Sequence, residues 1–166
     1  MLIESFLDYL RLERNYSERT IVSYRTDLRE FGGFLENTEA ELDWKKVHAD
    51  HVRNWMVSLM EGGKAATSVN RKLSSLRSFY RFLLRKKLVA VNPMLKIVGP
   101  KKKKPLPFFV REKDMNRLLD EIPFKEGFEG CRDRTILEMF YATGMRLSEL
   151  IGLNDADVDF ASKLIK

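Results

Sequence analysis

The apolar positions of the first 90 residues recur every three or four residues, which is the spacing of amphipathic helices. This pattern predicts four helices. Ser17 is placed to cap the start of the second helix, and a Gly-Gly pair at residues 62–63 ends the third. The apolar stripes are, in chain order, Ile3, Phe6, Leu7 and Leu10; Ile21, Tyr24, Leu28, Phe31 and Leu35; Val52, Trp55, Met56 and Leu59; and Val69, Leu73, Leu76, Tyr80 and Leu83.

The fourth predicted helix, about residues 65–87, has an unusual polar face. Residues 64–87 include eight basic side chains and no acidic one. A solvated face normally mixes both signs, because neighbouring opposite charges stabilise a helix. A face of one sign suits phosphates and base edges, and a basic surface helix without a partner is the alternative. The face comprises Thr67, Arg71, Ser74, Ser78, Arg81 and Arg85, flanked by Asn70 and Arg77.

A segment rich in proline and lysine, residues 92–107, follows these helices. Asn92-Pro93 closes the helical region, because the residue before a proline disfavours the helical conformation. The segment has too much proline for a helix and too much charge for a core, so we interpret it as an interdomain linker. We expect its lysines to follow DNA phosphates, with an ordinary solvated linker as the alternative. These lysines are Lys101, Lys102, Lys103 and Lys104.

The pattern of short apolar segments in residues 108–166 predicts the beginning of a second domain. Short helices are expected at about residues 111–119, from about residue 132, and after a Thr-Gly break at residues 143–144. Residues 127–130 are expected to form a loop, and residues 157–160 a turn leading into a strand. Because the sequence stops at this incipient strand, we expect the chain to be a piece of a longer protein.

Charge and composition narrow the functional classes. The net charge of +6 is uneven: residues 1–107 carry 21 basic and 12 acidic side chains, whereas residues 108–166 carry 9 and 12. The basic part is therefore the one we expect to meet a polyanion. A single cysteine, Cys131, excludes an internal disulfide framework, and with only two histidines a Cys/His zinc site is not plausible. No apolar run is long enough to span a bilayer and no signal peptide is evident, so we expect a cytoplasmic protein.

Residues 142–153 contain a motif that could carry chemistry. They read ATGMRLSELIGL and are followed by Asp-Val-Asp at residues 157–159. The Thr-Gly break lets Arg146 project from the start of a new helix. A guanidinium beside a helix N-terminus favours a phosphate. Glu149 is three residues further on and is placed to orient Arg146. From spacing alone, an ordinary surface Arg–Glu pair is the competing interpretation.

This segment resembles the first arginine box of the tyrosine recombinases of the Xer and phage integrase kind, which reads close to T-G-x-R-x-S-E-L before a D-V-D-like turn. The resemblance covers essentially the whole chain. The family's first two helices are similar to Phe6-Leu7-Asp8-Tyr9-Leu10, Glu13-Arg14, Ser17, Thr20, Ser23-Tyr24, Asp27-Leu28 and Phe31, and its fourth helix to residues 70–80.

The resemblance implies a mainly α fold with three parts. Residues 1–91 would form a four-helix, SAM-like core-type DNA-binding domain, residues 92–107 the linker, and residues 108–166 the truncated start of an α+β catalytic domain. Double-stranded DNA would be the substrate, and other recombinase protomers would be partners. The DNA-binding residues expected on the second and fourth helices and the linker are Arg19, Ser23, Arg25, Thr67, Asn70, Arg71, Ser74, Arg77, Arg81, Lys101, Lys102, Lys103 and Lys104.

The chemistry that the resemblance implies is DNA breakage and rejoining through a 3′-phosphotyrosyl intermediate, without a metal or other cofactor. Arg146 would be the first of two arginines that grip the scissile phosphate. The family's catalytic lysine, His-x-x-Arg box and nucleophilic tyrosine are expected beyond residue 166, because the five tyrosines present all precede Arg146. We therefore expect these 166 residues to bind DNA without cutting it. The alternatives are a non-catalytic accessory DNA-binding protein and a helical protein-interaction module.

Overall fold

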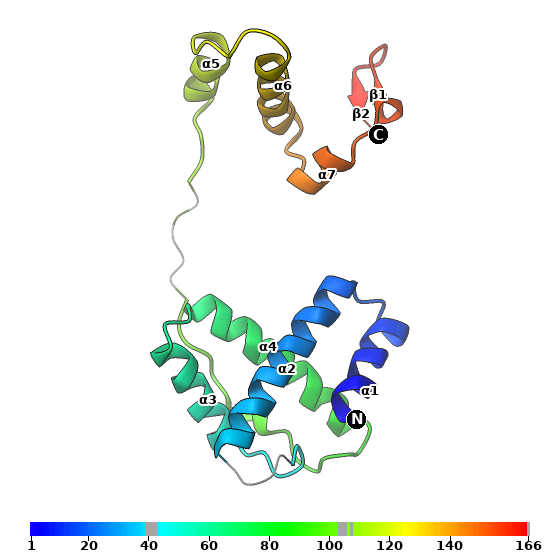
Figure 1. Cartoon of the computed structure of the whole chain (residues 1–166), viewed down its shortest axis with the longest axis vertical. Coiled ribbons are helices and arrows are strands. Elements are labelled where there is room, and N and C mark those ends of the chain that lie inside the picture. The colour runs from blue at the N-terminus through cyan, green and yellow to red at the C-terminus, as the bar shows by residue number, and fades with distance from the viewer. Residues whose placement is uncertain (39–42, 103–105, 107, 166) are drawn as a thin grey trace. The chain divides into compact units, whose positions relative to one another are not determined.

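The computed structural model describes residues 1–38, 43–102, 106 and 108–165, and it is mainly helical, as the sequence predicts (Figure 1). Internal contacts divide the chain into two compact units, Met1–Lys104 (unit 1) and Pro105–Lys166 (unit 2). The helices of unit 1 are α1 (Leu2–Asp8), which continues as a π-helical turn (Tyr9–Glu13), then α2 (Glu18–Thr38), α3 (Ala49–Glu61) and α4 (Ala66–Arg85), followed by a 3-10 turn (Pro93–Lys96).

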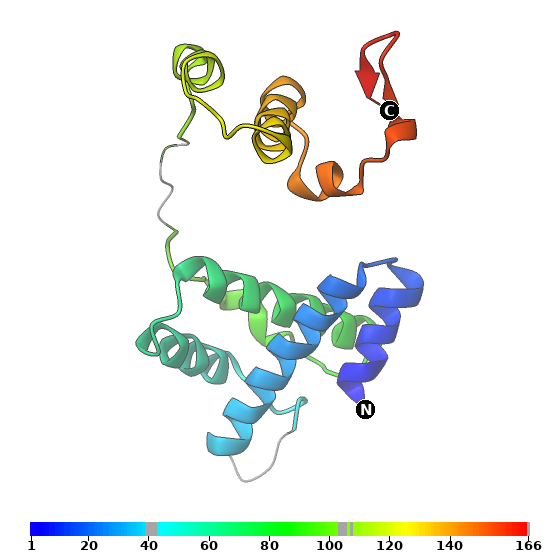
Figure 2. The same ribbon diagram turned by 45° about the horizontal axis from the view of Figure 1, so that its top comes forward.

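The core of unit 1 lies where α2 and α4 cross, with α1 and α3 packed beside them (Figure 2). The apolar stripes predicted for all four helices face this core, which confirms the helical periodicity. Aromatic rings fill its centre: the ring of Phe79 lies 5.3 Å from that of Phe6 and 5.0 Å from that of Trp44. Each fully buried side chain of this size stabilises the fold by about 1.5–3 kcal/mol relative to exposure.

The ends of the helices follow the signals in the sequence. The Ser17 hydroxyl accepts a hydrogen bond of 3.3 Å from the backbone N–H of Thr20, so the predicted N-cap of α2 is confirmed. α3 ends at Glu61 with Gly62 as its C-cap, and Gly63 then takes a left-handed conformation with φ of 76°.

Residues 93–100, which the sequence assigns to the linker, pack on unit 1. Met94 and Ile97 are buried. The guanidinium of Arg77 donates to the Ile97 carbonyl at 3.0 Å, and the side-chain amide of Asn70 donates to the Pro100 carbonyl at 2.8 Å. Two side chains of α4 therefore hold the backbone of this segment along the helix.

Substituting Gly99 is expected to disturb this packing. A Cβ on Gly99 would lie only 2.2 Å from Asn70 Oδ1 and 3.2 Å from Leu73 Cδ1. Gly99→Ala should therefore lower the free energy of unfolding by about 1–3 kcal/mol, the usual cost of overpacking. The measurement is urea unfolding followed by tryptophan fluorescence.

Gly33→Ala is the matched control for Gly99→Ala, with the opposite expected sign. Gly33 lies within α2, and a Cβ added there would meet no atom within 4 Å. Alanine should stabilise this helix by roughly 0.5–1 kcal/mol. Equal effects of the two substitutions would show that segment 97–100 is not held against α4.

Within residues 108–165, unit 2 contains three helices and a short hairpin. A helix starting at about residue 132 and a loop at 127–130 are wrong predictions, because the second helix of the unit begins at Phe128. Gly127 supplies the turn before it with φ of 85°, and the Lys125 carbonyl approaches Gly130 so closely that a Cβ would lie 1.7 Å away. The elements are α5 (Glu112–Asp120), α6 (Phe128–Thr143), α7 (Leu147–Gly152), a 3-10 turn (Asp155–Asp157), and antiparallel β1 (Val158–Asp159) and β2 (Leu164–Ile165).

Candidate nucleic-acid interface

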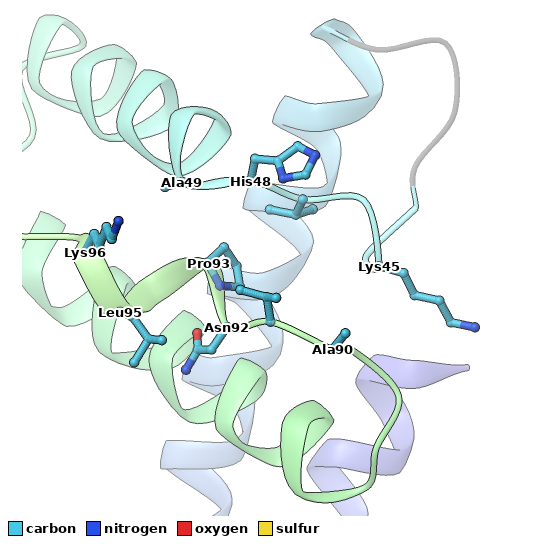
Figure 3. Close-up of a pocket in the computed structure, with 10 residues that line it drawn as sticks. Lys45, His48, Ala49, Ala90, Asn92, Pro93, Leu95 and Lys96 are labelled. Carbon is cyan, nitrogen blue, oxygen red and sulfur yellow. The ribbon is translucent and has the colours of Figure 1, made fainter.

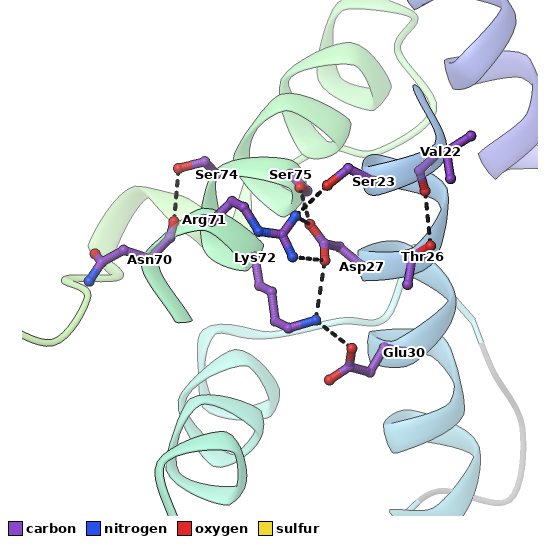
Figure 4. A network of polar contacts seen from close by, with 10 residues as sticks. All are labelled: Val22, Ser23, Thr26, Asp27, Glu30, Asn70, Arg71, Lys72, Ser74 and Ser75. Carbon is purple, nitrogen blue, oxygen red and sulfur yellow. Dashed lines mark hydrogen bonds and ion pairs between the residues drawn. The ribbon is translucent and has the colours of Figure 1, made fainter. Parts of the chain in front are cut away.

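A buried carboxylate lies at the crossing of α2 and α4 (Figure 4). Asp27 is fully buried. Its Oδ2 accepts hydrogen bonds of 2.7 Å from Arg71 Nη1 and from Ser75 Oγ, and its Oδ1 accepts from Arg71 Nη2 at 2.8 Å and Lys72 Nζ at 3.2 Å. A buried charge is tolerated when it is paired and its remaining lone pairs have donors, and Asp27 meets both conditions.

The two basic partners of Asp27 differ in exposure. The Arg71 side chain is 49% exposed, and its Nη1 also donates to the Ser23 hydroxyl. The Lys72 side chain is only 8% exposed and pairs with Glu30 as well. Lys72 thus points into the protein, although it belongs to the basic run of the fourth helix. The two positive and two negative charges of this cluster balance.

The outward side of α4 carries the face expected from the sequence. Thr67, Ser74 and Arg81 are exposed, whereas Ser78 is half-buried. Among the described residues, Arg81 has no acidic side chain within ion-pair distance. Arg85 lies over the ring of Tyr9, with 4.2 Å between the guanidinium carbon and the ring centre. Arg81 is therefore the residue of this face whose charge is least compensated.

The predicted residues on α2 have different surroundings. Arg19 is exposed and, within the described part of the chain, has no acidic partner. Arg25 instead donates to Glu4 on α1 at 3.1 Å, and its Nε is buried without a hydrogen-bond partner among the described residues. Arg25 therefore ties α1 to α2, while Arg19 remains exposed to solvent.

The predicted residues around the linker also divide into two groups. Asn70 and Arg77 are used to hold the backbone of segment 97–100. Lys101 and Lys102 are exposed, and they directly follow Pro100, whose carbonyl is bound to Asn70 on α4. Lys103 and Lys104 lie outside the described residues.

Arg146 is the N-cap residue that directly precedes α7 in unit 2, and Gly144 caps the end of α6 in a left-handed conformation with φ of 66°. Its guanidinium Nη1 donates to Glu149 Oε1 at 2.9 Å, and its backbone N–H donates to Glu149 Oε2 at 2.7 Å. The pKa of the Glu149 carboxyl is held below its usual value, first by the hydrogen bond from the Arg146 backbone and second by the hydrogen bond from the Arg146 side chain. The expected Arg–Glu pair is thus present, and the Arg146 side chain is 81% exposed.

Arg146→Ala is expected to leave unit 1 unaffected. Both tryptophans of the chain, Trp44 and Trp55, lie in unit 1, so their fluorescence reports its unfolding alone. The variant should unfold at the same urea concentration as the unchanged chain. A shifted midpoint would mean that the two units depend on one another for stability.

A pocket of about 420 Å³ lies between the start of α3 and residues 90–96 (Figure 3). Its walls are mostly apolar and include Val47, Pro93 and Leu95. Its polar lining is basic: Lys45, His48 and Lys96 border it, and no carboxylate or thiol is among the described lining residues. In the described part of the chain, no three His, Cys, Asp or Glu side chains are grouped to hold a metal ion, and no helix is both long and apolar enough to cross a membrane.

Comparison with known proteins decides the family. Residues 3–87 match the family model for the phage integrase N-terminal SAM-like domain, which is half of the chain, and residues 109–166 match that for the phage integrase family. The chain belongs to the phage integrase family. The resemblance found in the sequence is thereby confirmed.

The chain matches only part of the length of its curated relatives. The tyrosine recombinase XerC of Staphylococcus carnosus is 40% identical over 163 residues, which are 98% of this chain and 54% of the relative. XerC of Pediococcus pentosaceus is 41% identical over 164 residues, which are 99% and 54% of the two chains. This phage integrase chain thus spans about half the length of the curated relatives it matches.

Solved structures of a transposon integrase share the fold. The integrase of transposon Tn1549 in complex with circular intermediate DNA matches with a TM-score of 0.71 at 16% identity, over 99% of this chain and 52% of that one. The same integrase with transposon right end DNA matches with a TM-score of 0.71 at 18% identity, over 99% and 51%. At these identities the likeness concerns the fold, and it confirms the predicted fold class.

Proposed function

We propose that this chain is the DNA-binding portion of a site-specific tyrosine recombinase. The observation that carries the proposal is the outward face of α4, where exposed arginine and hydroxyl side chains stand in a stretch, residues 64–87, without any acidic residue. Such a face attracts the DNA backbone and offers donors to phosphates and base edges. Because the chain belongs to the phage integrase family, we propose double-stranded DNA as the polyanion that this face binds.

The contacts divide by the surroundings of each side chain. Arg19, Arg81, Lys101 and Lys102 are exposed and have no acidic partner among the described residues, so we assign them to backbone phosphates. We assign Lys103 and Lys104 to phosphates from the sequence alone. Thr67 and Ser74 supply hydroxyls for phosphates or base edges. The roles of Arg25, Asn70 and Arg77 are indirect, because these three side chains hold α1 and segment 97–100 in place.

We assign Arg146 to the scissile phosphate of the full-length recombinase. Its guanidinium is exposed and is oriented from one side by Glu149, which leaves further N–H donors for an anion. Donors in a fixed fork follow the charge that develops on the non-bridging oxygens of a pentacoordinate phosphorane. A tyrosine nucleophile of the full-length protein would form the 3′-phosphotyrosyl bond, and a 5′-hydroxyl would reverse it without a cofactor. We expect the full-length protein to act on DNA in the cytoplasm, in an assembly with other protomers.

The 166 residues on their own are expected to bind duplex DNA without forming a covalent adduct. All five tyrosines precede Arg146, so none corresponds to the family's nucleophile. The test is incubation with a labelled nicked duplex, followed by denaturing electrophoresis of the protein. A labelled band that survives denaturation would show strand cleavage and would overturn the assignment of this stretch as binding only.

A further inference from the structure

The geometry points to Asp27 as a positioning residue that aims Arg71 at a backbone phosphate. We propose that the buried carboxylate holds the guanidinium by its two terminal nitrogens, so that the neighbouring edge, formed by Nε and Nη2, is presented to the paired oxygens of a phosphate. This inference rests on the proposed DNA-binding function. It goes further by naming one contact, its geometry and the buried residue behind it.

The hydrogen bonds of Arg71 leave one edge of the guanidinium available. A guanidinium has five N–H donors. Nη1 uses two of them on Asp27 and Ser23, and Nη2 uses one on Asp27. Figure 4 shows both terminal nitrogens turned toward the carboxylate of Asp27. The donors that remain are the Nε–H and the second Nη2–H, which lie side by side and match two phosphate oxygens.

The carboxylate that holds Arg71 is itself fixed. Asp27 is fully buried and also accepts from Ser75 and Lys72, while Lys72 is bound in turn by Glu30. The side chain of Arg71 is nevertheless half exposed, so DNA has access to it. An arginine that is ordered before binding loses less side-chain entropy when the contact forms.

The charge balance of the cluster sets the kind of contact that Arg71 makes. Because Asp27 and Glu30 balance Arg71 and Lys72, the cluster adds little long-range attraction. Arg71 therefore acts through short, directed hydrogen bonds. Arg81 differs, since no acidic side chain of the described residues lies within ion-pair distance of it, and its contribution is that of a free positive charge.

A double-mutant cycle tests whether Asp27 acts through Arg71. The 166-residue chain and its Asp27→Asn, Arg71→Ala and doubly substituted variants would be titrated against a labelled generic duplex at fixed salt. Arg71→Ala is expected to weaken binding about tenfold or more, as loss of hydrogen bonds to a charged group does. Asp27→Asn should weaken binding several-fold when Arg71 is present and not at all when residue 71 is alanine.

The sign of the Asp27→Asn effect separates positioning from simple electrostatics. The substitution removes a negative charge beside a DNA-binding face, so charge alone predicts tighter binding. Positioning predicts weaker binding. Tighter binding, or a loss of affinity that is the same with and without the Arg71→Ala substitution, would overturn the inference.

Matched substitutions control for charge and for stability. Arg71→Lys keeps the charge but lacks the fork, so it should lose nearly as much affinity as Arg71→Ala, whereas Arg81→Lys should bind almost like the unchanged chain. Val52→Ala truncates a fully buried side chain of α3 that takes no part in the Asp27 cluster. It should lower stability, read from tryptophan fluorescence, and leave affinity unchanged.

The outcomes distinguish this inference from the proposed function. If the unchanged chain fails to bind the duplex at low salt, the proposed function and the role of Asp27 fall together. If the unchanged chain binds but Arg71→Lys binds equally well, only the role of Asp27 and Arg71 falls. Losses that depend on duplex sequence would assign Arg71 to a base edge and would contradict the phosphate contact.

Discussion

Asp27→Ala is expected to lower the free energy of unfolding of unit 1 by about 3–5 kcal/mol, the usual cost of removing one partner of a buried ion pair. The loss arises because the substitution strips Arg71, Lys72 and Ser75 of their common acceptor at the α2–α4 crossing. The effect on Lys72 is the largest, because its side chain is only 8% exposed and it would retain Glu30 but lose Asp27 as an ion-pair partner. Urea unfolding, followed by the fluorescence of Trp44 and Trp55, measures the effect in unit 1.

Asp50→Ala provides the comparison for Asp27→Ala. Asp50 forms an ion pair with Arg53 one turn away on α3, and its side chain is 80% exposed. Exposed pairs of this kind contribute roughly 0–1 kcal/mol, so the midpoint of unfolding should hardly move. If Asp27→Ala were as mild as Asp50→Ala, the buried carboxylate would not be the centre of the α2–α4 packing.

Replacing Arg81, Lys101 and Lys102 together by alanine is expected to weaken binding to every duplex and to flatten its salt dependence. Each phosphate contact releases counterions, so its loss reduces the slope of log affinity against log salt concentration by about 0.9. Three lost contacts should therefore reduce the slope by about 2.7. Fluorescence anisotropy at several salt concentrations, on duplexes of unrelated sequence, measures both changes.

The control for this triple variant removes the same charge elsewhere on unit 1. Lys45, Lys46 and Arg53 are exposed and lie before and within α3, which contributes no residue to the proposed interface. Their replacement by alanine should leave the slope nearly unchanged. Equal flattening by the two triple variants would mean that overall charge, rather than the α4 face, determines binding.

The sequence predicts the helices of unit 1 well, because their amphipathic pattern is local. It does not predict the inward turn of Lys72, which depends on partners on α2 more than 40 residues away. A signal was nevertheless present. Asp27 adjoins the apolar stripe of α2 next to Leu28, and a carboxylate at the edge of a core requires a cation. That requirement predicts a basic partner but does not say which helix or residue supplies it.

The sequence also does not distinguish a ligand contact from an internal one. Asn70 and Arg77 are donors of the type that DNA recognition uses, and the same donors satisfy the carbonyls of Ile97 and Pro100. Composition around residues 92–107 indicates a linker and contains no sign that its first part packs on α4. The role of a glycine is equally ambiguous in the sequence. The residue type of Gly130 indicates a loop, but Gly130 lies within α6, where it allows the Lys125 carbonyl to approach closely.

The most direct test of the central claim is binding of the 166-residue chain to a labelled duplex of generic sequence, followed by fluorescence anisotropy across a salt series. An interface of exposed arginines and lysines on phosphates predicts that log affinity falls linearly with log salt concentration, with a slope of about −0.9 for each contact. Absence of binding at low salt, or binding that is indifferent to salt, would contradict a phosphate-binding face on α4.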